Sequence, residues 1–158
     1  MLRVCKLPIL ITALFLMVNS VTFANERYRP VRDKVIIKEC GACHMAFQPQ
    51  MLPKRSWEKI MTGLSDHFGE DASSDVKTKE KITSYLLKNA ADSGWWGGKF
   101  MRGVKDHMTP MRITKTPHWV REHKGEVSSS VWKSPRIKSK ANCIACHSRA
   151  NRGDYDDD

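Results

Sequence analysis

Two copies of one five-residue motif set what this chain can fold into. Residues 40–44 read CGACH and residues 143–147 read CIACH, so both follow the pattern Cys-x-x-Cys-His. This pattern is the attachment signal for c-type haem, in which both cysteine sulfurs form thioether bonds to the haem. The adjacent histidine then becomes an axial ligand of the iron. The sequence therefore predicts two haem c cofactors. Their attachment residues are Cys40, Cys43, Cys143 and Cys146, and their proximal ligands are His44 and His147.

The sixth coordination position of each iron decides the kind of function. A filled position suits electron transfer, whereas an open position binds gases or substrates. The histidines outside the motifs are His67, His107, His118 and His123. They are numerous enough to fill both irons, which favours a carrier that passes electrons between redox partners.

His67 is the predicted distal ligand of the first haem. A helix is expected over residues 53–68, ended by Gly69, with His67 on its apolar face in the last turn. Neutral imidazole on an apolar face is a good iron ligand once a haem lies in the same domain. Methionine is the competing ligand type. The available methionines are Met45, Met51 and Met61, but methionines at helical spacing usually fill cores.

His123 is the predicted distal ligand of the second haem. Thr116 can cap a short helix that starts at Pro117 and places Trp119, Val120 and His123 on one face. On such a helix His118 points away from His123, so the two cannot face one haem. His107 lies in a polar segment rich in turn formers and is expected at the surface. His118 and His107 stay as alternatives to His123.

Two further helices are expected before residue 92. Residues 31–39 can form a short helix that carries Val35 and Ile36 and leads into the first motif. Residues 74–89 can form another, with Ser73 or Ser74 as the N-cap. Its predicted inward side chains are Ile82, Tyr85 and Leu86.

A glycine- and tryptophan-rich stretch, SGWWGG at residues 93–98, indicates a boundary between two domains. The expected units are an N-terminal haem domain at residues 25–92 and a C-terminal haem domain at residues 93–158. The tryptophans need cover, so this stretch is expected to pack on a haem edge or on an ordinary core between the domains. Little regular structure beyond short helices is expected in the C-terminal unit.

Residues 1–24 have the pattern of a secretory signal peptide. Arg3 and Lys6 precede a short apolar run at residues 7–18, and small residues at 22 and 24 predict cleavage after Ala24. The run is too short for a typical membrane-spanning helix, although an uncleaved anchor is the alternative. Either reading places the rest of the chain outside the cytoplasm, where haem is attached to exported cytochromes.

The remaining composition agrees with an exported haem protein. Of five cysteines, Cys5 belongs to the predicted signal peptide and the others belong to the motifs, so no disulfide is expected. The haems would take the place of the disulfides that small exported proteins use. The formal net charge of +10 suits an acidic protein partner or an anionic membrane surface, and nucleic acid is not an expected partner.

The chain resembles the dihaem cytochrome c family of proteobacteria over nearly all of residues 25–158. The similarity includes both motifs and HFGEDAS at residues 67–73. Further matching segments are residues 39, 45–47, 52–53, 57, 89–92, 112–114, 122–123, 131–132, 141–142, 149–150 and 153–155. The resemblance implies a mainly α fold in which a cytochrome-c-like N-terminal haem domain is followed by a largely irregular C-terminal haem domain.

The resemblance also implies a site and a role. Its distal-ligand positions correspond to His67 and His123, which gives each iron two histidines. The family relationship further implies a periplasmic electron carrier and not an enzyme. Its expected partner is an oxygen-binding monohaem cytochrome c, with a membrane cytochrome b as donor.

Two other functions compete with this one. A small dihaem enzyme or gas-binding sensor would need one iron that lacks a protein ligand at its sixth position. A zinc or dithiol protein would use the two Cys-x-x-Cys pairs without haem. The zinc interpretation leaves the histidine of each motif unexplained.

Overall fold

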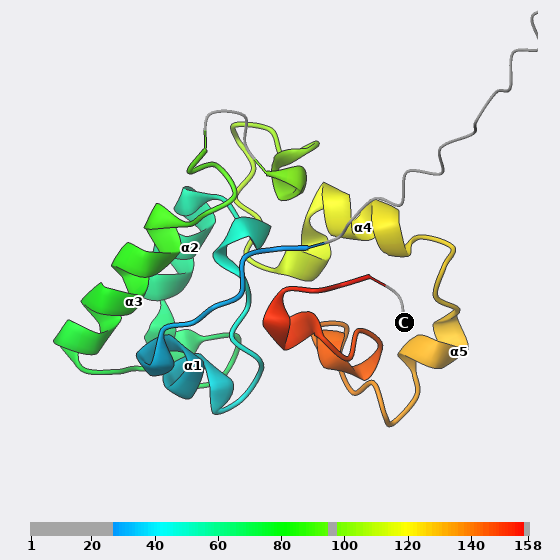
Figure 1. Cartoon of the computed structure of the whole chain (residues 1–158), viewed down its shortest axis with the longest axis horizontal. Helices are drawn as coiled ribbons and strands as arrows, with labels where there is room; N and C mark the ends of the chain where they lie inside the picture. Colours follow the sequence, from blue (N-terminus) through cyan, green and yellow to red (C-terminus); the bar gives the residue numbers. More distant parts are fainter. Residues whose placement is uncertain (1–26, 95–97, 157–158) are drawn as a thin grey trace, which may run out of the picture.

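The computed structural model describes residues 27–94 and 98–156, and its regular structure there is helical (Figure 1). The α-helices are α1 (Lys34–Gly41), α2 (Lys54–Thr62), α3 (Val76–Lys88), α4 (Pro117–His123) and α5 (Ser129–Trp132). Short 3₁₀ helices lie at Pro49–Met51, Leu64–Asp66, Lys99–Met101, Ile113–Lys115, Cys143–Ala145 and Ala150–Arg152. Within the described ranges there are isolated β-bridges but no β-strand. The predicted mainly α fold is therefore confirmed.

Helix α1 delivers the first motif. Asp33 caps it, because its carboxylate accepts hydrogen bonds from the backbone N–H groups of Val35 and Ile36. Ile36 is 1 % exposed and fixes the buried side of the helix. The helix starts later than the predicted residues 31–39 and continues into the motif as far as Gly41.

Helix α2 is shorter than predicted, and this changes how His67 is held. The apolar pattern indicated one helix over residues 53–68, but α2 ends at Thr62. Gly63 stands at the C-cap, where its N–H donates to the Ile60 carbonyl at 3.1 Å. Glycine has low helix propensity, so the chain tightens there into the 3₁₀ turn Leu64–Asp66. His67 consequently follows a turn and does not lie in the last turn of α2.

Helix α3 agrees with its prediction except at the start. Asp75, and not Ser73 or Ser74, is the N-cap, since its side chain accepts a hydrogen bond from the Thr78 N–H. Ile82 and Leu86 are buried as predicted. Tyr85 is partly buried against the same core.

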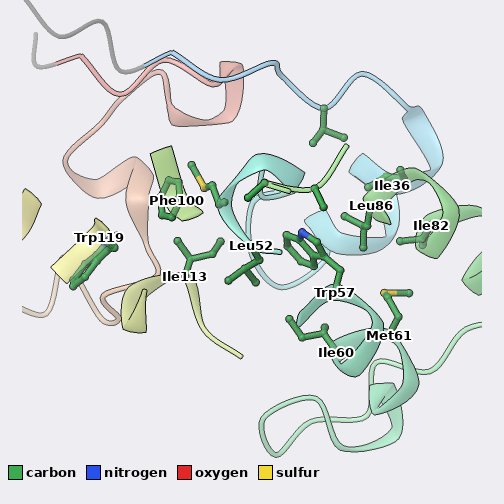
Figure 2. Close-up of a cluster of buried hydrophobic side chains, with 14 of the residues drawn as sticks. Ile36, Leu52, Trp57, Ile60, Met61, Ile82, Leu86, Phe100, Ile113 and Trp119 are labelled. Atoms are coloured by element: carbon green, nitrogen blue, oxygen red, sulfur yellow. The ribbon is translucent and has the colours of Figure 1, made fainter. Parts of the chain in front are cut away.

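One cluster of buried hydrophobic side chains extends through both halves of the described chain. In Figure 2, Ile36 and Ile82 lie at one end of this cluster, Leu52 lies near the middle, and Phe100 and Trp119 lie toward the other end. The cluster therefore draws on residues from both sides of the predicted boundary near residue 93. The division into domains stays a prediction.

Buried polar contacts join the same two halves. Gln48 is fully buried, and its side-chain nitrogen donates to the Ala150 carbonyl at 2.8 Å. Its side-chain oxygen accepts a hydrogen bond from the Tyr155 hydroxyl at 2.6 Å. The Tyr28 N–H donates to the Gly153 carbonyl at 2.7 Å. Gly153 has φ 76°, and a Cβ there would lie 2.1 Å from the Tyr28 carbonyl oxygen, so only glycine fits.

Two predictions concern residues outside the described ranges. The signal peptide at residues 1–24 lies outside them, and so do Trp95 and Trp96 of the predicted boundary stretch. Within residues 27–94 and 98–156, no helix combines the length and apolar character that crossing a membrane requires.

Gln48→Met in the haem-loaded protein is expected to lower the free energy of unfolding by about 2–4 kcal/mol, because the Ala150 carbonyl and the Tyr155 hydroxyl both lose a buried partner. Denaturant unfolding measures the change. Gln50→Met is the matched control, since the side-chain oxygen of Gln50 is buried without a hydrogen-bond partner in the described chain. Equal losses in the two variants would contradict the role given to Gln48.

Candidate haem sites

The structure brings His44 and His67 face to face at the first motif. Their ring centroids lie 6.1 Å apart and their planes differ by 30°. His44 Nδ1 donates to the Met45 carbonyl at 2.7 Å. A carbonyl only accepts, so Nδ1 carries the proton and Nε2 is left as the nitrogen that can bind a metal.

A strained turn presents His67. The His67 N–H donates to the Glu70 carbonyl at 2.7 Å, which closes the turn over Phe68 and Gly69. Phe68 has φ 60°, a conformation that is uncommon for a bulky residue and that marks functional turns. Its ring packs against the His67 ring at 4.8 Å between centroids, and the Arg112 guanidinium lies 3.9 Å over its face. These contacts hold the turn that aims His67 at His44.

The environment of His67 favours the neutral imidazole. Burial lowers its pKa from the usual value, and the nearby His44 and Arg112 lower the pKa further. Neutral imidazole is the form that binds a metal ion. At neutral pH this side chain is therefore ready to act as a ligand.

His123 and His147 meet at the second motif with a different ring arrangement. Their centroids lie 6.2 Å apart and their planes differ by 85°. His123 Nδ1 donates to the Trp119 carbonyl one turn earlier in α4, at 2.9 Å. Trp119 also stacks on the His123 ring, with centroids 4.1 Å apart. Thr116 caps α4 as predicted and thereby fixes where His123 lies, although Val120 is exposed and does not share the buried face.

Both separations match the space that one coordinated metal ion occupies. With metal–nitrogen bonds of about 2.0 Å and about 1.1 Å from each nitrogen to its ring centre, imidazoles on opposite sides of a metal have centroids about 6 Å apart. The measured values are 6.1 and 6.2 Å. Each motif histidine is thus paired with one further histidine at the spacing of two axial ligands.

The second pair opens onto a cavity large enough for a cofactor. Its volume is about 1050 Å³, just above the range of about 300–1,000 Å³ that is common for small-molecule sites. The lining includes Cys143, Cys146, His147, His123, Trp119 and Tyr155. Attachment cysteines, a histidine pair and aromatic walls in one cavity are what a covalently bound haem requires.

The other histidines occupy different environments. His118 is 3 % exposed, and its Nδ1 lies 3.0 Å from an Arg121 guanidinium nitrogen. Its Nε2 lies 3.5 Å from the Tyr28 hydroxyl. Its two ring nitrogens therefore already face polar groups of the protein. His107 is exposed, as its sequence context predicted. Met51 and Met61 are buried within the hydrophobic core.

A family model described as Dihaem cytochrome c matches residues 36–155, which include both motifs and both histidine pairs. This chain belongs to the dihaem cytochrome c family. Like the family, this dihaem cytochrome binds two haem c groups covalently, and its histidine pairs and cavity fit them. A comparison with curated protein sequences finds no match.

Solved structures give the same relationship. The diheme cytochrome c from Rhodobacter sphaeroides is 43 % identical, with a TM-score of 0.76 over 80 % of this chain and 99 % of that one. A second structure, of the protein called DHC purified from the same organism, is 42 % identical, with a TM-score of 0.67 over 79 % and 98 % of the chains. The diheme cytochrome c of Shewanella baltica OS155 is 29 % identical, with a TM-score of 0.63 over 78 % and 86 %.

Two of the four motif cysteines of this dihaem cytochrome, Cys40 and Cys143, have a raised thiol pKa. Burial raises the pKa of the Cys143 thiol to about 11, and burial followed by the nearby Glu39 raises that of Cys40. Zinc binds thiolates, which such thiols form poorly. Within the described chain, no three or more His, Cys, Asp or Glu side chains gather where they could hold a metal ion by themselves.

Sequence reasoning missed the side chains that orient the histidine rings. Trp119 could have been found, because it precedes His123 by one helical turn. Tyr155 packs against the His147 ring at 5.5 Å between centroids, and its hydroxyl bonds Gln48 across 107 positions of sequence. No local pattern could have indicated that contact.

Replacing both Cys143 and Cys146 by serine is expected to leave one covalently bound haem, because a hydroxyl forms no thioether bond. The intact mass of the denatured protein measures the number retained. The reciprocal change of Cys40 and Cys43 is the matched control and is expected to remove the other haem. Two haems retained by either variant would refute these attachment sites.

Proposed function

We propose that this dihaem cytochrome is a periplasmic electron carrier in which each iron has two histidine ligands. His44 and His67 ligate the haem on the first motif, and His147 and His123 ligate the haem on the second. The supporting observation is the pairing of each motif histidine with one other histidine at about 6 Å between ring centroids. His44 and His123 also have Nδ1 bonded to a backbone carbonyl, which directs Nε2 toward the space between the rings.

Filled axial positions limit the chemistry to electron transfer. The haem supplies the redox couple, and the chain supplies ligation, burial and orientation. In many cytochromes c, a methionine thioether ligand raises the reduction potential of the iron. An iron with two imidazole ligands has no thioether ligand, so low reduction potentials are expected. An open iron at either motif would instead favour the enzyme or gas-binding alternative.

His67→Ala is expected to leave two covalent haems and to open one iron, so that the reduced variant binds carbon monoxide at one of its two haems. The wild-type protein is expected to bind none. Optical spectra of the reduced protein under carbon monoxide measure this difference. The result is expected because no other imidazole faces His44 in the described chain.

His107→Ala and His118→Ala serve as the controls for this measurement. His107 is exposed and His118 contacts Arg121 and Tyr28, so neither change is expected to open an iron. Carbon monoxide binding by the His118 variant would identify His118, and not His123, as the second distal ligand. Carbon monoxide binding by the unaltered protein would favour the enzyme or sensor function.

The periplasmic location is proposed from the sequence of residues 1–24. Their basic start, apolar run and small residues before Asn25 are typical of a cleaved signal peptide. The intact-mass measurement of the exported protein also reports this step, because the cleaved chain begins at Asn25.

The proposed partner is a redox protein with an acidic docking surface. An oxygen-binding monohaem cytochrome c is proposed as the acceptor, and a membrane cytochrome b as the donor, from the family resemblance. Residues 127–153 surround the second motif and contain no Asp or Glu. Their exposed basic side chains include Lys133, Arg136 and Lys138. We call residues 127–153 the basic segment.

Electron transfer to the monohaem acceptor is expected to slow as salt rises, because the Debye length falls to about 10 Å at 0.1 M ionic strength. Lys133→Glu together with Lys138→Glu is expected to lower the second-order rate at low salt by about tenfold or more. Stopped-flow mixing measures both effects. Lys77→Glu on α3 is the control outside the basic segment. An equal loss in the control would mean that overall charge, and not this segment, governs docking.

A further inference from the structure

The two histidine pairs differ in the angle between their rings. The planes of His44 and His67 are 30° apart, whereas those of His123 and His147 are 85° apart. The centroid separations are nearly equal, so the spacing does not distinguish the sites. The ring angle does.

The distal ring of the crossed pair is fixed from within α4. His123 is hydrogen-bonded through Nδ1 to the Trp119 carbonyl, and its face is covered by the Trp119 indole at an interplanar angle of 15°. Rotation of the His123 ring would break the hydrogen bond and lose the stacking. The orientation of His123 is therefore set locally.

The proximal ring of the crossed pair has an aromatic neighbour from the end of the chain. Tyr155 packs against the His147 ring at 5.5 Å between centroids, with the planes 60° apart. Tyr155 is 8 % exposed, and its hydroxyl donates to the fully buried Gln48 side chain. The buried Tyr155 ring therefore packs beside His147 as part of the core.

The first site has a different neighbour in the same role. Phe47 stacks on His44, with centroids 4.8 Å apart and planes 22° apart. Phe47 lies nearly parallel to His44, whereas Tyr155 is tilted by 60° against His147. The two motif histidines therefore have aromatic neighbours of different orientation.

We propose that Tyr155 is a positioning residue that holds His147 crosswise to His123 and so makes the second iron electronically distinct from the first. The inference rests on the proposed ligation of each iron by two histidines. Tyr155 acts through His147, against whose ring it packs.

The electronic consequence follows from the shape of imidazole. Each ring has its π orbitals perpendicular to its plane and interacts with one of the two iron d orbitals that extend along the axial direction. Nearly parallel rings act on the same d orbital and separate the two in energy. Crossed rings act on one each and leave the two close in energy. Low-spin ferric iron then gives a rhombic electron paramagnetic resonance (EPR) signal in the first case and a strongly anisotropic, large-gmax signal in the second.

Low-temperature EPR of the oxidised protein with both haems attached tests this proposal. The wild-type protein is expected to show one rhombic and one large-gmax signal in equal amounts. Tyr155→Leu is expected to replace the large-gmax signal by a rhombic one and to leave the first signal unchanged. Tyr155→Phe keeps the ring and is expected to retain the large-gmax signal. Tyr85→Leu, which removes a ring from the α3 side of the core, is the control and is expected to alter neither.

Three results would overturn the proposal. Two rhombic signals from the wild-type protein would show that the second pair is not crossed. An unchanged large-gmax signal in Tyr155→Leu would show that Tyr155 does not set the angle, even if unfolding occurs at a lower temperature. If Tyr85→Leu changed the EPR signals as much as Tyr155→Leu does, the change would reflect a general loss of packing. A high-spin signal in the wild-type protein would instead refute the two-histidine ligation itself, so the two failures are distinguishable.

Discussion

The fold has to hold two imidazole rings about 6 Å apart at each of the two haem motifs. The other structural elements serve this constraint. The pairs measure 6.1 Å and 6.2 Å between centroids. Helix α1 leads into the first motif, and the turn closed by the His67–Glu70 hydrogen bond places the opposing ring. Helix α4 supplies the distal ring at the other end. Helix α3 contributes Ile82 and Leu86 to the hydrophobic core.

Local signals in the sequence predicted much of this arrangement. The motifs indicated the attachment residues, and Thr116 before Pro117 predicted the start of α4 and so the place of His123. The predicted C-terminal end of α2 was wrong, because the apolar pattern of the sequence continues past Gly63. The low helix propensity of this glycine ends the α-helix at Thr62. His67 is nevertheless paired with His44, by a turn and not by a helix.

The contacts that could not be predicted join residues far apart in sequence. Gln48 bonds Ala150 and Tyr155, and Tyr28 bonds Gly153, yet none of these residues belongs to a repeating pattern. The ring angles were equally inaccessible, because each depends on an aromatic neighbour that the tertiary fold supplies. Propensity and periodicity describe short segments, whereas these features arise only when both halves have packed together.

The hydrogen bond between Tyr28 and Gly153 also has a consequence for how the protein matures. Tyr28 precedes the first motif in the sequence, whereas its hydrogen-bond partner Gly153 follows the second motif. A chain without the haem on the second motif would leave unfilled the cavity that Cys143, Cys146 and His147 line. Such an intermediate would expose the aromatic side chains that line this cavity, among them Trp119 and Tyr155. A molecule with one haem thus differs from the complete protein in the apolar surface that water can reach.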